Sequence, residues 1–171
     1  PTRLEAKVAF PSQWTLLVAV SGATAQKGAE RLRDYNDAAM LARWAAVAAS
    51  APPTGAEAAP PTLASSIGAE RGRLGAATDE GLLNGLSTRI TARDDGTLAP
   101  DGRAPAGALL RRFEQFFCES EQLVPGVAAA MGRADGDALA PLVDRSQALT
   151  ESHLRNTLEE TEWLPAAARR L

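Results

Sequence analysis

The sequence is poor in the side chains that build disulfide frameworks and metal sites. It has one Cys and one His among 171 residues, and aromatic residues make up 5% of the chain. One Cys excludes an internal disulfide framework, and one His excludes a Cys/His or multi-His metal site. The 18 Lys and Arg are scattered and slightly outnumbered by 21 Asp and Glu. There is therefore no basic patch of the kind that binds nucleic acid.

Long apolar runs and export signals are also absent. No run approaches the ~18 apolar residues that a membrane span needs. The first residues lack the charged-then-apolar pattern of a signal peptide. We therefore expect a cytoplasmic protein without a membrane or nucleic-acid partner. The content of 45% apolar and 23% charged residues is ordinary for one globular domain, and the sequence leaves the oligomeric state open.

Two strand patterns are found at the start of the chain. In Thr2 to Phe10 apolar residues alternate with more polar ones, which predicts a strand with one buried face. Trp14 to Val20 is almost continuously apolar, as in a strand buried on both faces. The segment Pro11-Ser12-Gln13 between them is typical of a turn. Together these patterns predict a β-hairpin whose second strand is the more central.

The next part of the chain favours helix, interrupted by loops. Gly28 to Ser50 predicts a helix with Met40, Trp44 and Val47 on its buried stripe. An Ala/Pro-rich loop is expected over 51–62 because prolines stop regular structure.

The middle of the chain has weaker patterns. A helical region interrupted by glycines is expected over 62–86, and a short strand or extended segment over 87–90. Asp-Gly turn signals predict a loop over 91–106.

The clearest helix pattern covers Leu109 to Val124. Its apolar side is predicted to contain Leu109, Phe113, Phe116, Phe117 and Val124, and its polar side Arg111, Arg112, Glu114 and Gln115. Asp137 is a candidate N-cap for a further helix. That helix should turn Leu139, Leu142, Val143 and Leu149 inward, and a last helix is expected around Thr161.

Three segments together indicate a family. Leu16 to Asn36 consists of an apolar strand, a Ser21-Gly22 turn and a helix start that carries Tyr35 next to Asn36. The segments 111–122 (RRFEQFFCESEQ) and 142–147 (LVDRSQ) follow later. In content, order and spacing these segments resemble the C-terminal half of a galactokinase, within the GHMP family of small-molecule kinases. The resemblance covers most of 16–164, although the middle matches poorly.

The resemblance implies a fold and an organisation. The fold would be α+β and mostly helical, with the N-terminal β-hairpin packed on helices as in the ferredoxin-like C-terminal lobe of a GHMP kinase. Residues 1–171 would form a single domain that is a fragment of this lobe. The phosphate-binding loop and the catalytic carboxylate of the family would lie before the chain, and a second Gly-rich motif would lie after it.

The resemblance also implies an activity for the parent protein. It would be a sugar kinase that uses ATP and Mg²⁺ to phosphorylate a monosaccharide hydroxyl, with galactose as the nearest family substrate. This chain would form the sugar side of the cleft, with Tyr35 contacting the sugar and Ser21, Gly22 and Lys27 lining the cleft. It supplies no catalytic residue and no metal ligand, so the fragment alone is expected to be inactive.

Other candidate residues favour structural interpretations. Cys118 lies among phenylalanines and is expected to be a buried, inert thiol. His153 is expected to be solvated, and Glu119 to be structural. The glycines of 68–75 lack the preceding strand and the hydroxyl partners of a phosphate loop.

Two other functions stay open at this point. The chain could be a non-catalytic ligand-sensing or interaction module derived from the kinase lobe, because binding needs fewer specific residues than phosphoryl transfer. It could also be an unrelated helical scaffold, which would bind neither nucleotide nor sugar. An intact Gly-rich loop and acidic base in the parent would favour the kinase.

Overall fold

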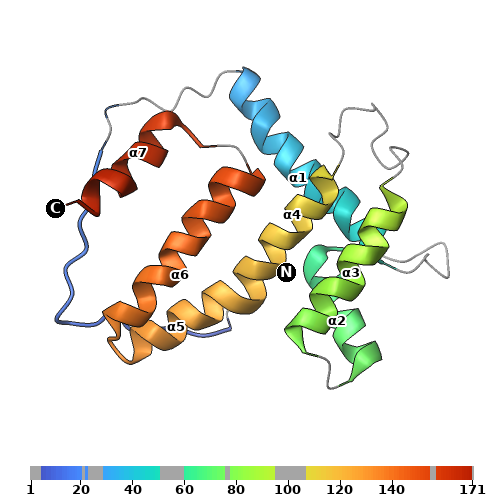
Figure 1. The fold of residues 1–171 in the computed structure, drawn as a ribbon, viewed down its shortest axis with the longest axis horizontal. Helices are drawn as coiled ribbons and strands as arrows, with labels where there is room; N and C mark the ends of the chain where they lie inside the picture. The colour runs from blue at the N-terminus through green and yellow to red at the C-terminus, as the bar shows by residue number, and fades with distance from the viewer. Residues whose placement is uncertain are drawn as a thin grey trace.

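The computed structural model describes residues 5–20, 22, 29–50, 60–75, 78–94, 107–154 and 157–170, and the side chains of 29–35 lie outside this description. Within these ranges the regular structure is helical and there is no strand (Figure 1). The predicted α+β lobe is therefore wrong for the described part of the chain.

The N-terminal β-hairpin is the clearest correction. The predicted turn exists, since the Trp14 amide donates to the Pro11 carbonyl at 3.0 Å, but the residues on either side of it form no ladder. The segment after it forms no regular structure, and Leu16, Leu17, Val18 and Val20 are between 75% and 84% exposed. The apolar pattern of this segment is typical of a buried strand. No strand forms in this segment, because the described residues provide no second strand with which it could pair.

Four helices form the hydrophobic core. Helix α1 (Ala29–Ala49) contacts α2 (Leu63–Leu74), α3 (Asp79–Arg93) and α4 (Ala108–Phe117), and α3 also packs on α2 and α4 (Figure 1). The largest fully buried side chains of this core come from α2, α3 and α4: Ile67, Leu82, Leu86, Ile90, Leu109, Phe113 and Phe117. The predicted helix over 28–50 is confirmed as α1.

The buried face of α1 differs from the predicted stripe. Met40 and Val47 are each 37% exposed, whereas the side chains that reach zero exposure are Ala45, Ala46, Ala48 and Ala49. Trp44 is partly buried at the edge of the core. Small alanine side chains allow neighbouring helices to approach closely, so this contact depends on residue size and not on hydrophobicity alone.

Helices α2 and α3 each begin at a threonine cap. Thr62 and Ser65 form a capping box at the start of α2, and the Thr78 hydroxyl accepts the Gly81 amide hydrogen bond at 3.2 Å at the start of α3. The strand or extended segment predicted over 87–90 is wrong, because these residues belong to α3. Ile90 continues a buried series with Leu82 and Leu86, and this spacing of four is a helical signal.

One long helical rod follows. It consists of α4, the π-helical segment η1 (Cys118–Leu123) and α5 (Val124–Gly132), which confirms the helix predicted from Leu109. The π segment ends at Leu123, two residues before Pro125, which lacks an amide hydrogen and would clash with the carbonyl four residues back. Widening the turn removes this conflict: the Val124 amide donates to the Glu119 carbonyl, five residues back. Val124 itself is exposed, contrary to prediction.

The C-terminal helical segments follow in the chain. They are α6 (Gly136–Leu149), the π-helical η2 (Thr150–Leu154) and α7 (Glu159–Ala168). Of these, α6 and η2 pack on the rod. Asp135, not Asp137, caps α6 by accepting the Ala138 amide at 3.0 Å. Helix α6 lies beside α5 (Figure 1), where Leu142 packs so closely on Gly126 that a Cβ there would meet its methyl carbon at 3.1 Å.

The inward face predicted for α6 is only partly realised. Leu139, Leu142 and Leu149 are half-buried, whereas Val143 is exposed. Helix α7 contacts α6 through polar groups: Arg169 pairs with Asp144, and the Gln147 amide donates to the Thr161 carbonyl at 3.3 Å. The last helix is thus confirmed near its predicted position.

Candidate functional site

The residues to which the resemblance assigns roles fall mostly outside the described part of the chain. Ser21 and Lys27 lie outside it, and Tyr35 belongs to α1 but its side chain is not described. Gly22 is described: it is exposed and has φ of 79°, a left-handed conformation that favours glycine. The roles of Tyr35, Ser21, Gly22 and Lys27 therefore stay predictions.

A pocket of about 500 Å³ opens between α1, α2 and α4. Its described walls are mostly apolar, with two arginines and no acidic residue: Ala42, Arg43, Pro60, Pro61, Thr62, Leu63, Ala64, Arg112 and Phe116. Pro60 and Pro61, just before α2, line the pocket together with residues of α1 and α4, and the Thr62 cap places the first turn of α2 at its edge. Concave apolar surfaces with a few convergent polar groups are the usual form of small-molecule sites.

Arg112 is the most unusual side chain in this pocket. Its Nε donates to the Ala38 carbonyl at 3.3 Å and its Nη1 to Gln115 Oε1 at 2.5 Å, and both acceptors are neutral. Among the described residues, no carboxylate lies within ion-pair distance of its guanidinium. Burial lowers the pKa of Arg112 below its usual value because desolvation disfavours the charged form. A guanidinium nevertheless keeps its proton in proteins, so a positive charge stands here without a described acidic partner.

Two further donors lie at the edge of the same pocket. Arg43 is exposed on α1. In the first turn of α2, the Thr62 hydroxyl accepts the Ser65 amide at 3.1 Å and the Thr62 carbonyl accepts the Ser66 amide at 2.9 Å. The amides of Leu63 and Ala64 precede these two in the turn, where helix N–H groups have no intrahelical acceptor.

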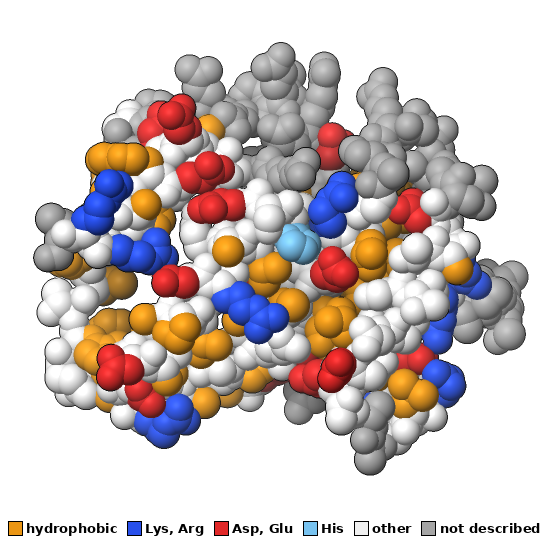
Figure 2. Space-filling view, in the orientation of Figure 1, with side chains coloured by type: hydrophobic (Ala, Val, Ile, Leu, Met, Phe, Trp, Pro, Cys, Tyr) orange, Lys and Arg blue, Asp and Glu red, His pale blue; other side chains and the backbone are white. Residues whose placement is uncertain are grey.

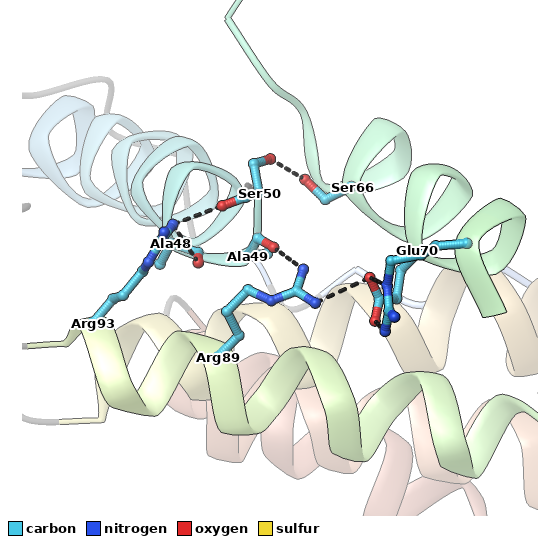
Figure 3. Close-up of polar contacts among 8 residues, drawn as sticks. Ala48, Ala49, Ser50, Ser66, Glu70, Arg89 and Arg93 are labelled. Atoms are coloured by element: carbon cyan, nitrogen blue, oxygen red, sulfur yellow. Dashed lines mark hydrogen bonds and ion pairs between the residues drawn. The ribbon is translucent and has the colours of Figure 1, made fainter. Parts of the chain in front are cut away.

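A second polar cluster is centred on the buried carboxylate of Glu70 (Figure 3). Glu70 is 4% exposed and accepts hydrogen bonds from Arg73 at 2.6 and 3.1 Å and from Arg89 at 3.0 Å. These bonds lower the pKa of the carboxyl to about 2, although burial opposes the shift. All its described charges are paired, so the cluster is structural.

Two arginines on the same side of α3 donate hydrogen bonds to carbonyls at the C-terminus of α1. Arg93 donates to the Ser50 carbonyl at 2.6 Å and to the Ala48 carbonyl at 3.3 Å, and Arg89 donates to the Ala49 carbonyl at 2.7 Å (Figure 3). The last carbonyls of a helix lack intrahelical partners and carry a partial negative charge. The two arginines of α3 therefore satisfy the end of α1 and join the two helices.

Replacing Arg93 by Met tests this contact. We expect a loss of ~1–2 kcal/mol in the free energy of unfolding, because Met keeps the aliphatic stem but leaves the Ala48 and Ser50 carbonyls without a charged donor. Chemical denaturation followed by circular dichroism measures it. The matched control is Arg133→Met, since Arg133 is exposed and makes only a 3.7 Å ion pair. Equal losses in the two variants would contradict the capping role.

A third group of polar contacts joins η1 to α6. The Ser146 hydroxyl donates to Glu119 Oε1 at 2.7 Å, and Arg145 Nη2 lies 3.6 Å from Cys118 Sγ. Cys118 is buried, as predicted. These contacts join the segments 111–122 and 142–147, which both carry the family resemblance.

His153 lies at the contact between η2 and α4. Its side chain is 23% exposed, and Nε2 lies 3.7 Å from Glu114 Oε2 across the gap between η2 and α4. The side chain thus stays partly exposed to solvent, as expected, but it also faces a carboxylate of α4. The residue is part of the contact between these two helical segments.

Other site types find no support in the described residues. Gly68 and Gly72 are inside α2, where backbone amides serve the helix and cannot form a phosphate loop. No group of three or more His, Cys, Asp or Glu within the described ranges could hold a metal ion. None of the helices in the structure combines the length and apolarity required to cross the bilayer. Acidic and basic side chains are interspersed on the face in Figure 2.

Comparison with known proteins finds no family model, no curated protein and no solved structure that matches this chain. The site must therefore be judged from its own geometry. The sequence pattern predicts Arg112 on the polar side of its helix, whereas in the structure its side chain lines the pocket. Its position four residues before Phe116, at the border of the apolar stripe, is the only sequence signal for this.

Proposed function

We propose that this chain is part of an ATP-dependent sugar kinase of the galactokinase-like type. The single observation that carries the proposal is the contact between the segments 111–122 and 142–147. They are separate in sequence, yet they pack as neighbouring helices, and Ser146 donates a hydrogen bond to Glu119 between them. A pair of helices in this order is what the resemblance implies for both segments.

We assign ATP binding and the sugar contact to different parts of the protein. Kinases of this kind act by positioning and electrostatic stabilisation of the transferred phosphoryl group. ATP and Mg²⁺ are assigned to parts of the protein other than this chain. This chain is proposed to contribute Tyr35 to the sugar side of the cleft, next to Ser21, Gly22 and Lys27. The proposal includes a cytoplasmic location and a monosaccharide partner, but no α+β lobe.

A sugar panel tests the activity directly. The protein that carries this chain is expected to convert ATP to ADP in the presence of one monosaccharide, with galactose the first to try, and to yield a sugar phosphate. ADP release by coupled assay and the mass of the product give the result. No ATP turnover above the sugar-free rate with any sugar would refute the kinase proposal.

Tyr35→Phe tests the substrate contact. Loss of one hydrogen bond worth ~0.5–1.5 kcal/mol should weaken sugar use by ~2- to 13-fold in kcat/KM, while the thermal midpoint stays unchanged. Trp163→Phe is the control, because Trp163 is an exposed aromatic residue of α7. Unchanged kinetics toward every accepted sugar would remove the assignment of Tyr35.

A second candidate function is a non-catalytic ligand-sensing module, and the arginine-lined pocket favours it. Binding needs a shaped cavity and a few polar groups, and both are present around Arg112. The two candidates differ in ATP turnover. Saturable ligand binding by a protein that hydrolyses no ATP with any sugar would support the sensing module.

A further inference from the structure

We propose that the pocket between α1, α2 and α4 binds a small organic anion, with its phosphate or carboxylate head against Arg112 and its apolar body against Phe116 and the prolines. This inference does not depend on the kinase activity. It follows from the charges, the donors and the shape of the pocket.

The charged side chains among the described lining residues of the pocket are all of one sign. They are Arg43 and Arg112, and no described lining residue is Asp or Glu. Elsewhere in the described chain, arginines form ion pairs with acidic side chains; for example, Arg89 pairs with Glu70 at 3.0 Å. A low-dielectric wall strengthens the attraction of a positive group for an anion. A negatively charged ligand is therefore the natural complement of this pocket.

The donors of Arg112 are only partly used. A guanidinium has five N–H donors. Two hydrogen bonds are present in the structure, to the Ala38 carbonyl and to Gln115 Oε1, and both acceptors are neutral. These bonds hold the side chain in place while leaving donors for a ligand. Planar guanidinium groups bind carboxylates and phosphates through paired hydrogen bonds.

The first turn of α2 adds to this attraction. Leu63 and Ala64 line the pocket, and their amides precede the capped amides of the turn. A helix N-terminus attracts negative charge. This contribution supports the arginines and does not carry the proposal, which rests on the cavity and on the guanidinium inside it.

The size and the walls determine the rest of the ligand. A volume of about 500 Å³ is larger than inorganic phosphate needs and lies within the range of small-molecule sites. Phe116, Pro60 and Pro61 provide apolar contact area on the walls. The ligand should therefore have an apolar or aromatic body as well as an anionic head.

Titration of the protein with phenyl phosphate and with benzoate tests the inference. Isothermal calorimetry at low salt should show saturable binding of at least one probe, weakened by added salt. Benzyl alcohol, which has the ring but no charge, should not bind. Tighter binding of phenyl phosphate would identify a phosphate site, and tighter binding of benzoate a carboxylate site.

Two variants separate a loss of the site from a loss of the fold. Arg112→Met should weaken binding by ~10- to 100-fold, the equivalent of one charge-assisted hydrogen-bonded contact. Ala64→Glu should weaken binding to the same extent, because the new carboxylate repels the anion. The fold should be kept, because an acidic residue in the first turn stabilises a helix. Arg133→Met is the control and should bind normally, because Arg133 is exposed on the turn after α5.

The outcomes decide the proposal in both directions. Binding that is lost in Arg112→Met and Ala64→Glu, but kept in Arg133→Met, would establish the anion site. No binding of either anion at millimolar concentration, or equal binding by all three variants, would overturn it. If Arg112→Met fails to fold, Ala64→Glu still decides.

Discussion

Replacing Phe113 by Ala is expected to destabilise the protein by ~3–5 kcal/mol, the loss typical of truncating a buried phenylalanine. For a chain of this size the thermal midpoint should fall by ~6–20 °C. Thermal and chemical denaturation followed by circular dichroism measure both quantities.

The position of Phe113 explains the size of this effect. The side chain has zero exposure and lies on α4, the helix that packs against both α1 and α3. Its ring centre lies 5.9 Å from that of Phe117 with the planes tilted by 54°, a favourable aromatic arrangement. The fully buried α1 residues of this core are alanines, which are too short to fill the space that the ring would leave. A cavity would therefore remain, and cavities add to the cost of the lost apolar burial.

The control for this experiment is Trp163→Ala. Trp163 is a larger aromatic residue, but it is 59% exposed on α7, so its removal should change stability by no more than ~0.5 kcal/mol. A loss below ~1 kcal/mol for Phe113→Ala, or an equal loss for Trp163→Ala, would show that α4 does not form the centre of the core.

Glu70→Gln is expected to cost about 2 kcal/mol at neutral pH. The substitution keeps the shape of the side chain but removes the charge that compensates Arg73 and Arg89. Breaking a fully buried ion pair costs ~3–5 kcal/mol. The cost here is smaller because the Arg73 and Arg89 side chains are 61% and 31% exposed, and water screens part of the interaction.

The lowered pKa of Glu70 predicts how the free energy of unfolding depends on pH. Its hydrogen bonds, chiefly those from Arg73, lower its pKa in the folded protein to about 2 from a reference of 4.5. Above pH 4.5 the group is ionised in both the folded and the unfolded protein, so its stabilising contribution is complete. Between pH 4.5 and pH 2 the unfolded chain takes up the proton first, and the contribution is lost as the pH falls.

Denaturation at pH 7, 4 and 3 measures this dependence. The wild-type protein should lose stability more steeply than Glu70→Gln, and the two curves should converge at low pH. Glu5→Gln is the matched control, since Glu5 is exposed in the N-terminal segment. A variant curve parallel to the wild-type curve throughout would contradict the role of Glu70.

Helix positions were largely predictable from the sequence, because their signals are local. The phenylalanine pattern after Leu109 predicts α4, and the Ala-rich stretch before Ser50 predicts α1. The N-cap of α6 is Asp135 and not the predicted Asp137, since both aspartates can accept a hydrogen bond from a backbone amide. Where two residues are equally suitable as a cap, the geometry of the surrounding chain determines which of them accepts the hydrogen bond.

The buried faces were harder to predict. Hydrophobicity favoured Met40 and Val47 on α1, but the structure buries the alanines because three helices converge there. The candidate pocket was not predictable at all. It brings Arg43 of α1, Pro60 before α2 and Arg112 of α4 to one place, and nothing in their local sequence indicates that they meet.

Composition, helix propensity and the absence of cysteine and histidine clusters thus determined by themselves that the chain is mostly helical and has no disulfide framework. Its two strand patterns show the limit of local information: a strand needs a hydrogen-bonding partner from elsewhere in space. Tertiary structure alone decided that Leu16 to Val20 lies exposed without such a partner in the described chain, and that Glu70 is buried between two arginines. Local patterns depend on neighbours in sequence, whereas pairing, burial and the charge balance of a pocket depend on residues that meet only when the chain folds.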